Sequence, residues 1–249
     1  MKRLRRVTEA EVISEFLKNE FYHEEFHRDR QQWEHLVLDA DITNERENLL
    51  RRALLFRRRG HMWRELPAET QWWQVQIEPG DLERVRVFPR AHWLRIGRGN
   101  FYLKDVAERV RKARRDGKPR DFISKIQSLS DRLRVEYDNS SVMLIGVDEA
   151  RPLTILEGNH RLTAALLASP SILQSRFRVL VGFSLLMTES CWYETNVRNL
   201  WRYAKHRMCH LYDREADTER MLSQLEAEAG AHAGYAEPMV AHKAVAEPK

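Results

Sequence analysis

Cysteine is scarce in this sequence, and long apolar runs are absent. Only two cysteines, Cys191 and Cys209, occur among the 249 residues, and neither belongs to a CxxC motif. This count excludes a disulfide framework and a cysteine-rich zinc module. No apolar stretch approaches the roughly 20 residues that a membrane-spanning helix needs, and the basic residues 1–6 lead into charged sequence rather than the apolar segment of a signal peptide. We therefore expect a cytoplasmic protein without a membrane partner.

Basic residues only slightly outnumber acidic ones. Lys and Arg number 42 against 37 Asp and Glu, which gives a net charge of +5 at pH 7. The surplus indicates an anionic partner, but it does not distinguish nucleic acid from a nucleotide or a phosphorylated metabolite. Arginine prevails in basic runs such as 57–59, and its planar guanidinium suits phosphate, although such runs are equally typical of solvated helix faces.

Helical patterns dominate residues 1–70, which we interpret as an N-terminal helical cap. Thr8 and Glu11 form a capping-box pair ahead of an apolar helix. A second helix is expected over residues 45–59, with Gly60 at its C-terminal end.

Residues 71–185 alternate between strand and helix patterns. The expected elements, in chain order, are a strand at 72–77, helices over 106–113 and 121–133, a hairpin over 142–156, a helix over 160–168 and a strand at 177–183. We therefore predict an α/β (α+β) fold in which a small mixed sheet follows the cap. A long helix is expected within 186–228, and the tail 229–249, rich in Ala, Glu and Pro, is expected to be disordered.

The most informative motif is Glu157-Gly158-Asn159-His160-Arg161, where a strand runs into a glycine and a helix begins. The free amides and the dipole of a helix N-terminus attract phosphate, Gly158 lets the backbone approach it, and Arg161 can grip two oxygens. Glu157 is a candidate to hold Mg²⁺ or to accept a proton from an attacking hydroxyl. The alternative is that Asn159 merely caps the helix, while the two basic side chains face solvent or pair with Glu157.

This motif and the order of the elements around it resemble the ParB/sulfiredoxin superfamily over about residues 72–184. In that superfamily a Gly-x-x-Arg-type turn at a helix start binds nucleotide phosphates. The resemblance implies that Gly158, Asn159, His160 and Arg161 bind ATP, ADP or CTP with Mg²⁺. Sulfiredoxins carry a catalytic cysteine where this chain has Asn159, and ParB partition proteins carry a helix-turn-helix module that we do not find after residue 184.

Within the superfamily, the motif is most similar to that of the free-serine kinases, whose turn is of the Asp-Gly-His type. Those enzymes take their base from the region after the first strand, where this chain offers Glu78, Asp81 and Glu83. The resemblance thus implies a phosphotransferase or nucleotide hydrolase that acts on a small-molecule acceptor, with one of these carboxylates as base. Arg98, in the loop at 97–100, is a further candidate to contact the nucleotide.

A second class of function is a nucleic-acid-binding or nuclease-like module, in which the same turn holds a backbone phosphate. Aromatic and basic residues along the helix after residue 194 are compatible with a nucleic-acid groove. We favour the competing interpretation, in which the apolar side of that helix closes the core and its basic side is solvated. The tryptophans can likewise stack a base or pack the cap onto the sheet, and packing is favoured for Trp63, Trp72, Trp73 and Trp93.

A third class rests on His23-Glu24-Glu25-Phe26-His27, which matches HExxH. On one helix face, the two histidines would bind zinc and Glu24 would polarise a zinc-bound water. The strongly charged flanks favour a surface helix instead, because the metalloprotease motif lies on a helix buried in a cleft. A zinc metallohydrolase is therefore the alternative that we rank last.

Overall fold

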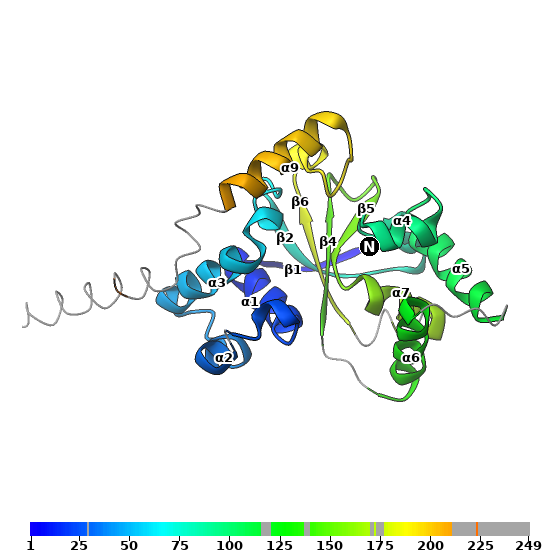
Figure 1. Ribbon diagram of the computed structural model, residues 1–249, viewed down its shortest axis with the longest axis horizontal. Coiled ribbons are helices and arrows are strands. Elements are labelled where there is room, and N and C mark those ends of the chain that lie inside the picture. The colour runs from blue at the N-terminus through cyan, green and yellow to red at the C-terminus, as the bar shows by residue number, and fades with distance from the viewer. Residues whose placement is uncertain are drawn as a thin grey trace, which may run out of the picture.

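A mixed six-stranded sheet forms the middle of the molecule, with helices on both sides (Figure 1). The computed structural model describes residues 1–28, 30–115, 121–136, 140–169, 172, 177–210 and 223. The strands are β1 (Lys2–Val7), β2 (Gln71–Gln76), β3 (Val85–Arg86), β4 (Ser141–Gly146), β5 (Leu153–Glu157) and β6 (Arg178–Phe183). The α-helices are α1 (Glu9–Glu20), α2 (Arg30–Leu38), α3 (Glu45–Trp63), α4 (Ala91–Gly97), α5 (Leu103–Arg115), α6 (Asp121–Val135), α7 (Asn159–Ala168) and α9 (Val197–His210), and the 3₁₀ helices are η1 (Glu24–Phe26), η2 (Pro79–Glu83) and η3 (Leu185–Glu189). The predicted mixed α/β fold is confirmed.

The sheet has the strand order β1-β2-β6-β4-β5-β3. Strand β4 pairs in parallel with β6 and antiparallel with β5, so the hairpin predicted over 142–156 is confirmed. All six residues of β4 are buried, as expected for a central strand that is covered on both faces. The pairing of Met143 with Glu157 sets the end of β5 beside the beginning of β4. Glu157 therefore stands where the sheet gives way to α7.

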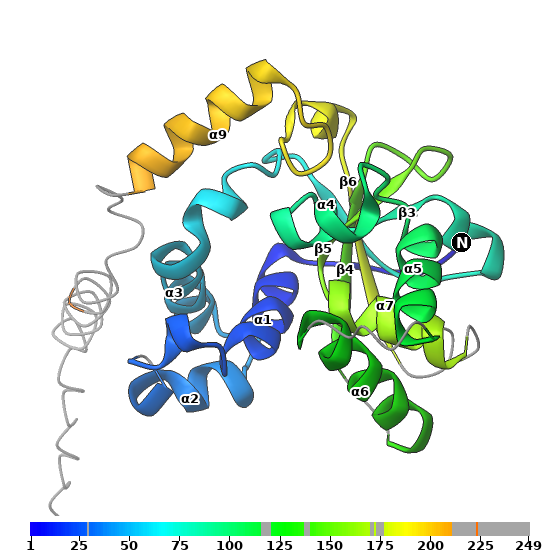
Figure 2. The ribbon, with the colours of Figure 1, turned by 45° about the vertical axis from the view of Figure 1, so that its right-hand side comes forward.

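Alternate residues of β4 face two different apolar clusters. Met143 and Ile145 belong to a cluster that they share with α1 and α3. Val142 and Leu144 belong to a second cluster, shared with α5, α6 and α7. This alternation follows from the two-residue period of a strand. Figure 2 shows the resulting arrangement, with α1 to α3 on one side of the sheet and α4 to α7 on the other.

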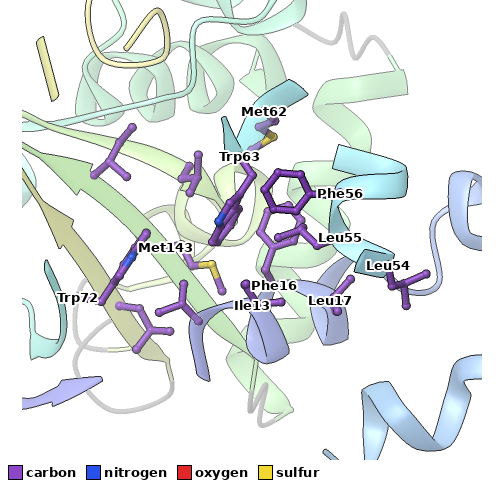
Figure 3. Close-up of a cluster of buried hydrophobic side chains, with 14 of the residues drawn as sticks. Ile13, Phe16, Leu17, Leu54, Leu55, Phe56, Met62, Trp63, Trp72 and Met143 are labelled. Atoms are coloured by element: carbon purple, nitrogen blue, oxygen red, sulfur yellow. The ribbon is translucent and has the colours of Figure 1, made fainter. Parts of the chain in front are cut away.

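The cap shares its core with the sheet instead of forming one of its own. In the cluster of Figure 3, Trp63 of α3 lies near Trp72 of β2, and Phe16 of α1 and Met143 of β4 lie in the same group. The two indole rings stack with centroids 6.3 Å apart and 12° between their planes. Gly182 on β6 makes room for this contact, because a Cβ there would lie 2.9 Å from the Trp72 ring. Packing of Trp63 and Trp72 between cap and sheet is therefore confirmed.

Several expectations about the first 70 residues need correction. Residues 2–7 form β1, which pairs antiparallel with β2, so they belong to the sheet and not to the helical cap. The Thr8 half of the predicted capping box is confirmed, because Thr8 accepts a hydrogen bond from the Glu11 amide at 3.2 Å, whereas the Glu11 carboxylate pairs with Arg5 and Arg178. The helix predicted over 45–59 is interrupted where expected, at Arg59, which has a non-helical backbone conformation, but Gly60 does not end it, because α3 continues to Trp63.

The C-terminal part of the chain is described as far as α9. Beyond it, the rest of the predicted segment 186–228, apart from Ser223, and the whole tail 229–249 lie outside the described residues. No helix in the part of the chain that the structure describes is long and apolar enough to cross a membrane.

Candidate functional site

The glycine turn between β5 and α7 adopts a conformation that other residues rarely take. Gly158 has a φ of 97°, in the left-handed region, and it is the N-cap residue of α7. A Cβ at this position would lie 3.1 Å from both methyl groups of Val142 on β4. Positive φ and close packing both favour glycine here. The turn that we predicted from the sequence is therefore present and tightly packed against the central strand.

The N-terminus of α7 carries backbone amides without a partner inside the helix. The first helical hydrogen bond is donated by the amide of Leu162 to the carbonyl of Gly158, at 2.8 Å. The amides of Asn159, His160 and Arg161 precede it, so they are the donors that a helix start leaves for caps, water or ligands. With the helix dipole, they form a region of positive potential at the turn.

The helix start lines a hollow of about 330 Å³, which lies at the lower end of the range of about 300 to 1,000 Å³ that is typical of small-molecule sites. Its lining comes from α1, α3, α4, β5 and α7 and from residues that flank them, namely Phe16, Asn19, Glu20, His23, Met62, Arg90, Trp93, Leu156, Glu157, Gly158, Asn159, His160 and Arg161. The whole predicted motif, Glu157 to Arg161, therefore lines one hollow. The cap forms the opposite wall.

A polar cluster joins the cap to this motif. The Nδ2 amide of Asn19 on α1 donates to Glu157 Oε2 at 2.8 Å and to the carbonyl of Ser141 at 2.9 Å. The Arg161 guanidinium donates to Asn19 Oδ1 at 3.0 Å and forms an ion pair with Glu157. Pairing of Arg161 with Glu157 was the alternative raised from the sequence. It means that Arg161 is held against the carboxylate instead of extending into the hollow.

The pKa values of the two carboxylates of the hollow are shifted in opposite directions. At Glu157, desolvation raises the pKa above its usual value, despite the opposing effect of Arg161. At Glu20, burial also disfavours the ionised form, but His23 and Arg59 together lower the pKa to about 2. Arg59 lies 2.7 Å from Glu20, and it is the residue at which α3 departs from helical geometry. Glu20 is therefore ionised at neutral pH, whereas burial favours the neutral form of Glu157.

His160 lies against two aromatic rings at the edge of the hollow. Its ring centroid is 5.2 Å from that of Trp93 and 4.9 Å from that of Phe122. Desolvation, and then nearby cationic groups, lower the pKa of His160 to about 4. The imidazole is therefore neutral at pH 7, so its contribution to anion binding is a hydrogen bond and not a charge. Trp93 is 3% exposed and also belongs to the core.

The sequence suggested that Asn159 could cap α7, but the N-cap residue is Gly158 and Asn159 has another role. Its Oδ1 accepts a hydrogen bond from the backbone amide of Phe88 at 2.7 Å. Phe88 follows β3 and leads to Arg90, whose side chain is exposed and lines the hollow. Asn159 thus ties the start of α7 to the segment that carries Arg90.

The other predicted carboxylates lie outside this hollow. Glu78 and Asp81 form ion pairs with the amino group of Met1, at 3.1 and 2.8 Å, and Glu83 pairs with Lys104. Asp81 also pairs with Arg84 at 2.5 Å, and its pKa is lowered because these partners outweigh the cost of burial. None of the three lines the hollow around Gly158.

Arg98 is likewise set apart from the motif. It caps the C-terminus of α4 in a left-handed conformation with a φ of 48°, its side chain is exposed, and it does not line the hollow. The arginine that the structure brings to the hollow from this region is Arg90, eight positions earlier in the chain.

The HExxH match does not form a helix face. Only Glu24–Phe26 are helical, in the 3₁₀ turn η1, with His23 before it and His27 after it. Ligands at i and i+4 of an α-helix are therefore not presented together. Across the described ranges, no group of three or more His, Cys, Asp or Glu side chains is arranged to hold a metal ion.

Sequence reasoning missed three residues of the hollow: Asn19, Glu20 and Arg90. The first two lie on α1, far from the motif in the chain, and no local pattern marks them as partners of Glu157. Arg90 follows Pro89 directly before α4, a position that carried no phosphate-loop pattern.

Comparisons of the chain with family models, curated proteins and solved structures gave no match.

Proposed function

We propose that the protein binds the phosphate groups of ATP, ADP or CTP at the N-terminus of α7, and that it acts as a phosphotransferase or nucleotide hydrolase on a small-molecule acceptor. The observation that carries the proposal is the hollow of about 330 Å³ that residues 157–161 line at the start of α7. A helix start with a glycine turn is a preferred binding site for phosphate. The resemblance of the motif to the ParB/sulfiredoxin superfamily supports a nucleotide as the phosphate compound.

The charges around the hollow support an anionic ligand. Both carboxylates of the lining are already paired with arginine, Glu157 with Arg161 and Glu20 with Arg59. Arg90 adds a positive charge at the exposed rim, near the ring of Phe88. We therefore assign the phosphate contacts to the α7 amides and Arg90, and we assign Arg161 to holding Glu157 in place.

Glu157 is the group in this proposal that moves a proton. Burial raises its pKa, and a raised pKa makes a carboxylate a stronger base for the proton of an acceptor hydroxyl. Glu78, Asp81 and Glu83 do not line this hollow, and they pair with Met1 or Lys104 instead. Mg²⁺ fits poorly at Glu157, because Arg161 and Asn19 already share its Oε2 oxygen.

Calorimetric titration with ATP, ADP and CTP, with and without Mg²⁺, tests the proposal. Arg90→Ala should weaken nucleotide binding by about tenfold or more, because a charge-assisted contact to phosphate is lost. Arg98→Gly is the matched control, since it removes an exposed arginine outside the hollow from a backbone position that glycine accepts.

The outcomes separate the classes of function. Binding of at least one nucleotide that Arg90→Ala weakens and Arg98→Gly leaves unchanged supports the proposal. Equal effects of the two variants, or no binding at millimolar nucleotide, contradict it. Preference for an oligonucleotide, with a steep dependence on salt, would assign the turn to nucleic acid instead.

A further inference from the structure

Helix α9 turns its apolar stripe away from the core. The side chains of Val197, Leu200, Trp201 and Met208 are 85%, 48%, 78% and 69% exposed. Their spacing places them on one face of the helix, together with the exposed Ala204. The interpretation that the apolar side of this helix closes the core is therefore wrong.

The opposite side of α9 is the one that packs onto the protein. Asn199 is 4% exposed and donates to the carbonyls of Thr188 and Glu194 at 2.8 and 2.7 Å. His206 Nδ1 lies 2.7 Å from the buried carboxylate of Glu65. Because polar contacts fix this side, the apolar stripe is held outward. In both views α9 runs along the outer edge of the described part of the molecule (Figures 1 and 2).

Cations flank the stripe on both sides. At about 100° per residue, Arg198 and Lys205 lie on one flank and Arg207 on the other, and all three are exposed. Residues 197–210 contain no Asp or Glu. An apolar stripe that faces solvent between flanking cations is the pattern of a helix that lies in an anionic lipid interface, with tryptophan at the level of the headgroups.

We propose that α9 docks the protein onto an anionic lipid surface, with its aliphatic side chains among the acyl chains, Trp201 at the level of the headgroups and the flanking cations beside the lipid phosphates. A bilayer with anionic headgroups matches both the apolar stripe and the flanking cations. A second copy of α9 would bring like charges together. Nucleic acid would meet the cations but leave the aliphatic side chains exposed to water. This partner goes beyond the proposed nucleotide site and does not depend on it. It departs from the expectation of no membrane partner, which rested on the lack of a membrane-spanning segment in the sequence.

Flotation of the full chain with vesicles tests the proposal. The protein should float with phosphatidylcholine vesicles that contain about 30% phosphatidylserine and remain unbound with phosphatidylcholine alone. Trp201→Ser with Leu200→Ser should weaken partitioning by about tenfold or more, through lost apolar burial. Arg198→Glu with Lys205→Glu should weaken it by about 30-fold or more, because each lost cation contributes about a factor of five and each new carboxylate adds repulsion.

Matched controls lie elsewhere on the surface. Val135→Ser removes an apolar side chain that is 81% exposed on α6, and Lys112→Glu reverses an exposed charge on α5. Both variants should float like the wild type. Failure of the wild type to float, or equal flotation of the α9 variants, overturns the proposal. A lipid-free dimer that Trp201→Ser dissociates, or tighter binding to single-stranded DNA than to vesicles, would name a different occupant and also overturn it.

Discussion

The cap meets the rest of the molecule in two chemically different ways. Toward β2, it packs through apolar surface, with the Trp63 and Trp72 rings stacked. At the C-terminal end of α1, it meets the sheet through polar groups, with Asn19 bonded to Ser141, Glu157 and Arg161. Apolar burial is not directional and tolerates small shifts, whereas each hydrogen bond requires a defined geometry. We infer that the apolar contact holds the cap on the sheet, and that the polar contact positions the side chains of Glu157 and Arg161 in the hollow.

The largest expected effect comes from breaking the apolar contact. Trp72→Ala should lower the free energy of unfolding by about 3 to 5 kcal/mol, because a large buried side chain is lost and leaves a cavity. Urea denaturation followed by circular dichroism measures this loss. Trp201→Ala is the matched control, since its side chain is 78% exposed, and it should change stability by about 0.5 kcal/mol or less. If the two variants lost equal free energy of unfolding, the apolar contact would not be the main attachment of the cap.

Breaking the polar contact should have a smaller effect on stability and a larger one on the site. Asn19→Leu leaves Glu157 and Arg161 without their shared amide partner, which should cost about 2 to 3 kcal/mol. It should also shift the pH dependence of nucleotide binding, because Glu157 loses a donor that stabilises its ionised form. Calorimetry across a pH series measures this shift. Asn48→Leu on α3, outside the hollow, is the control, and a wild-type pH profile in Asn19→Leu would contradict the positioning role.

The smallest expected effect is the pH-dependent contribution of Glu20. Its pKa is lowered to about 2 in the folded protein from the usual 4.5 of a glutamate. The ion pair therefore contributes stability that is present above pH 4.5 and is lost as the pH falls toward 2. Between pH 6 and 3, the stability difference between the wild type and Glu20→Gln should narrow by about 1 to 2 kcal/mol. A difference that stays constant with pH in urea titrations would show that the Glu20–Arg59 pair is not coupled to folding.

The sequence predicted local elements well and their long-range partners poorly. The hairpin over 142–156 and the glycine turn at 158 carry strong local signals, namely strand periodicity and a glycine at a strand–helix junction. Strand β1 carried no such signal, because Lys and Arg fill residues that pair with β2 only in the folded chain. Residues 2–7 are a strand because they pair with β2, a partner that the local sequence does not indicate.

The same division applies to the candidate site. Residues 157–161 were found as a motif because they are consecutive, and they line one hollow. Asn19 and Glu20 reach that hollow from α1, through contacts that span more than a hundred positions for Asn19. The outward stripe of α9 was misassigned for a related reason: helical periodicity identifies an apolar face but does not say which face the protein covers.

If the start of α7 binds phosphate between the cap and α4, a crystal structure of the protein with a bound nucleotide should show it. Phosphate oxygens should lie within about 3 Å of the amides of residues 159–161, with the Arg90 guanidinium on the same phosphate. A nucleotide bound elsewhere, for example in the hollow between α3 and α9 that His206 and Cys209 line, would contradict the claim.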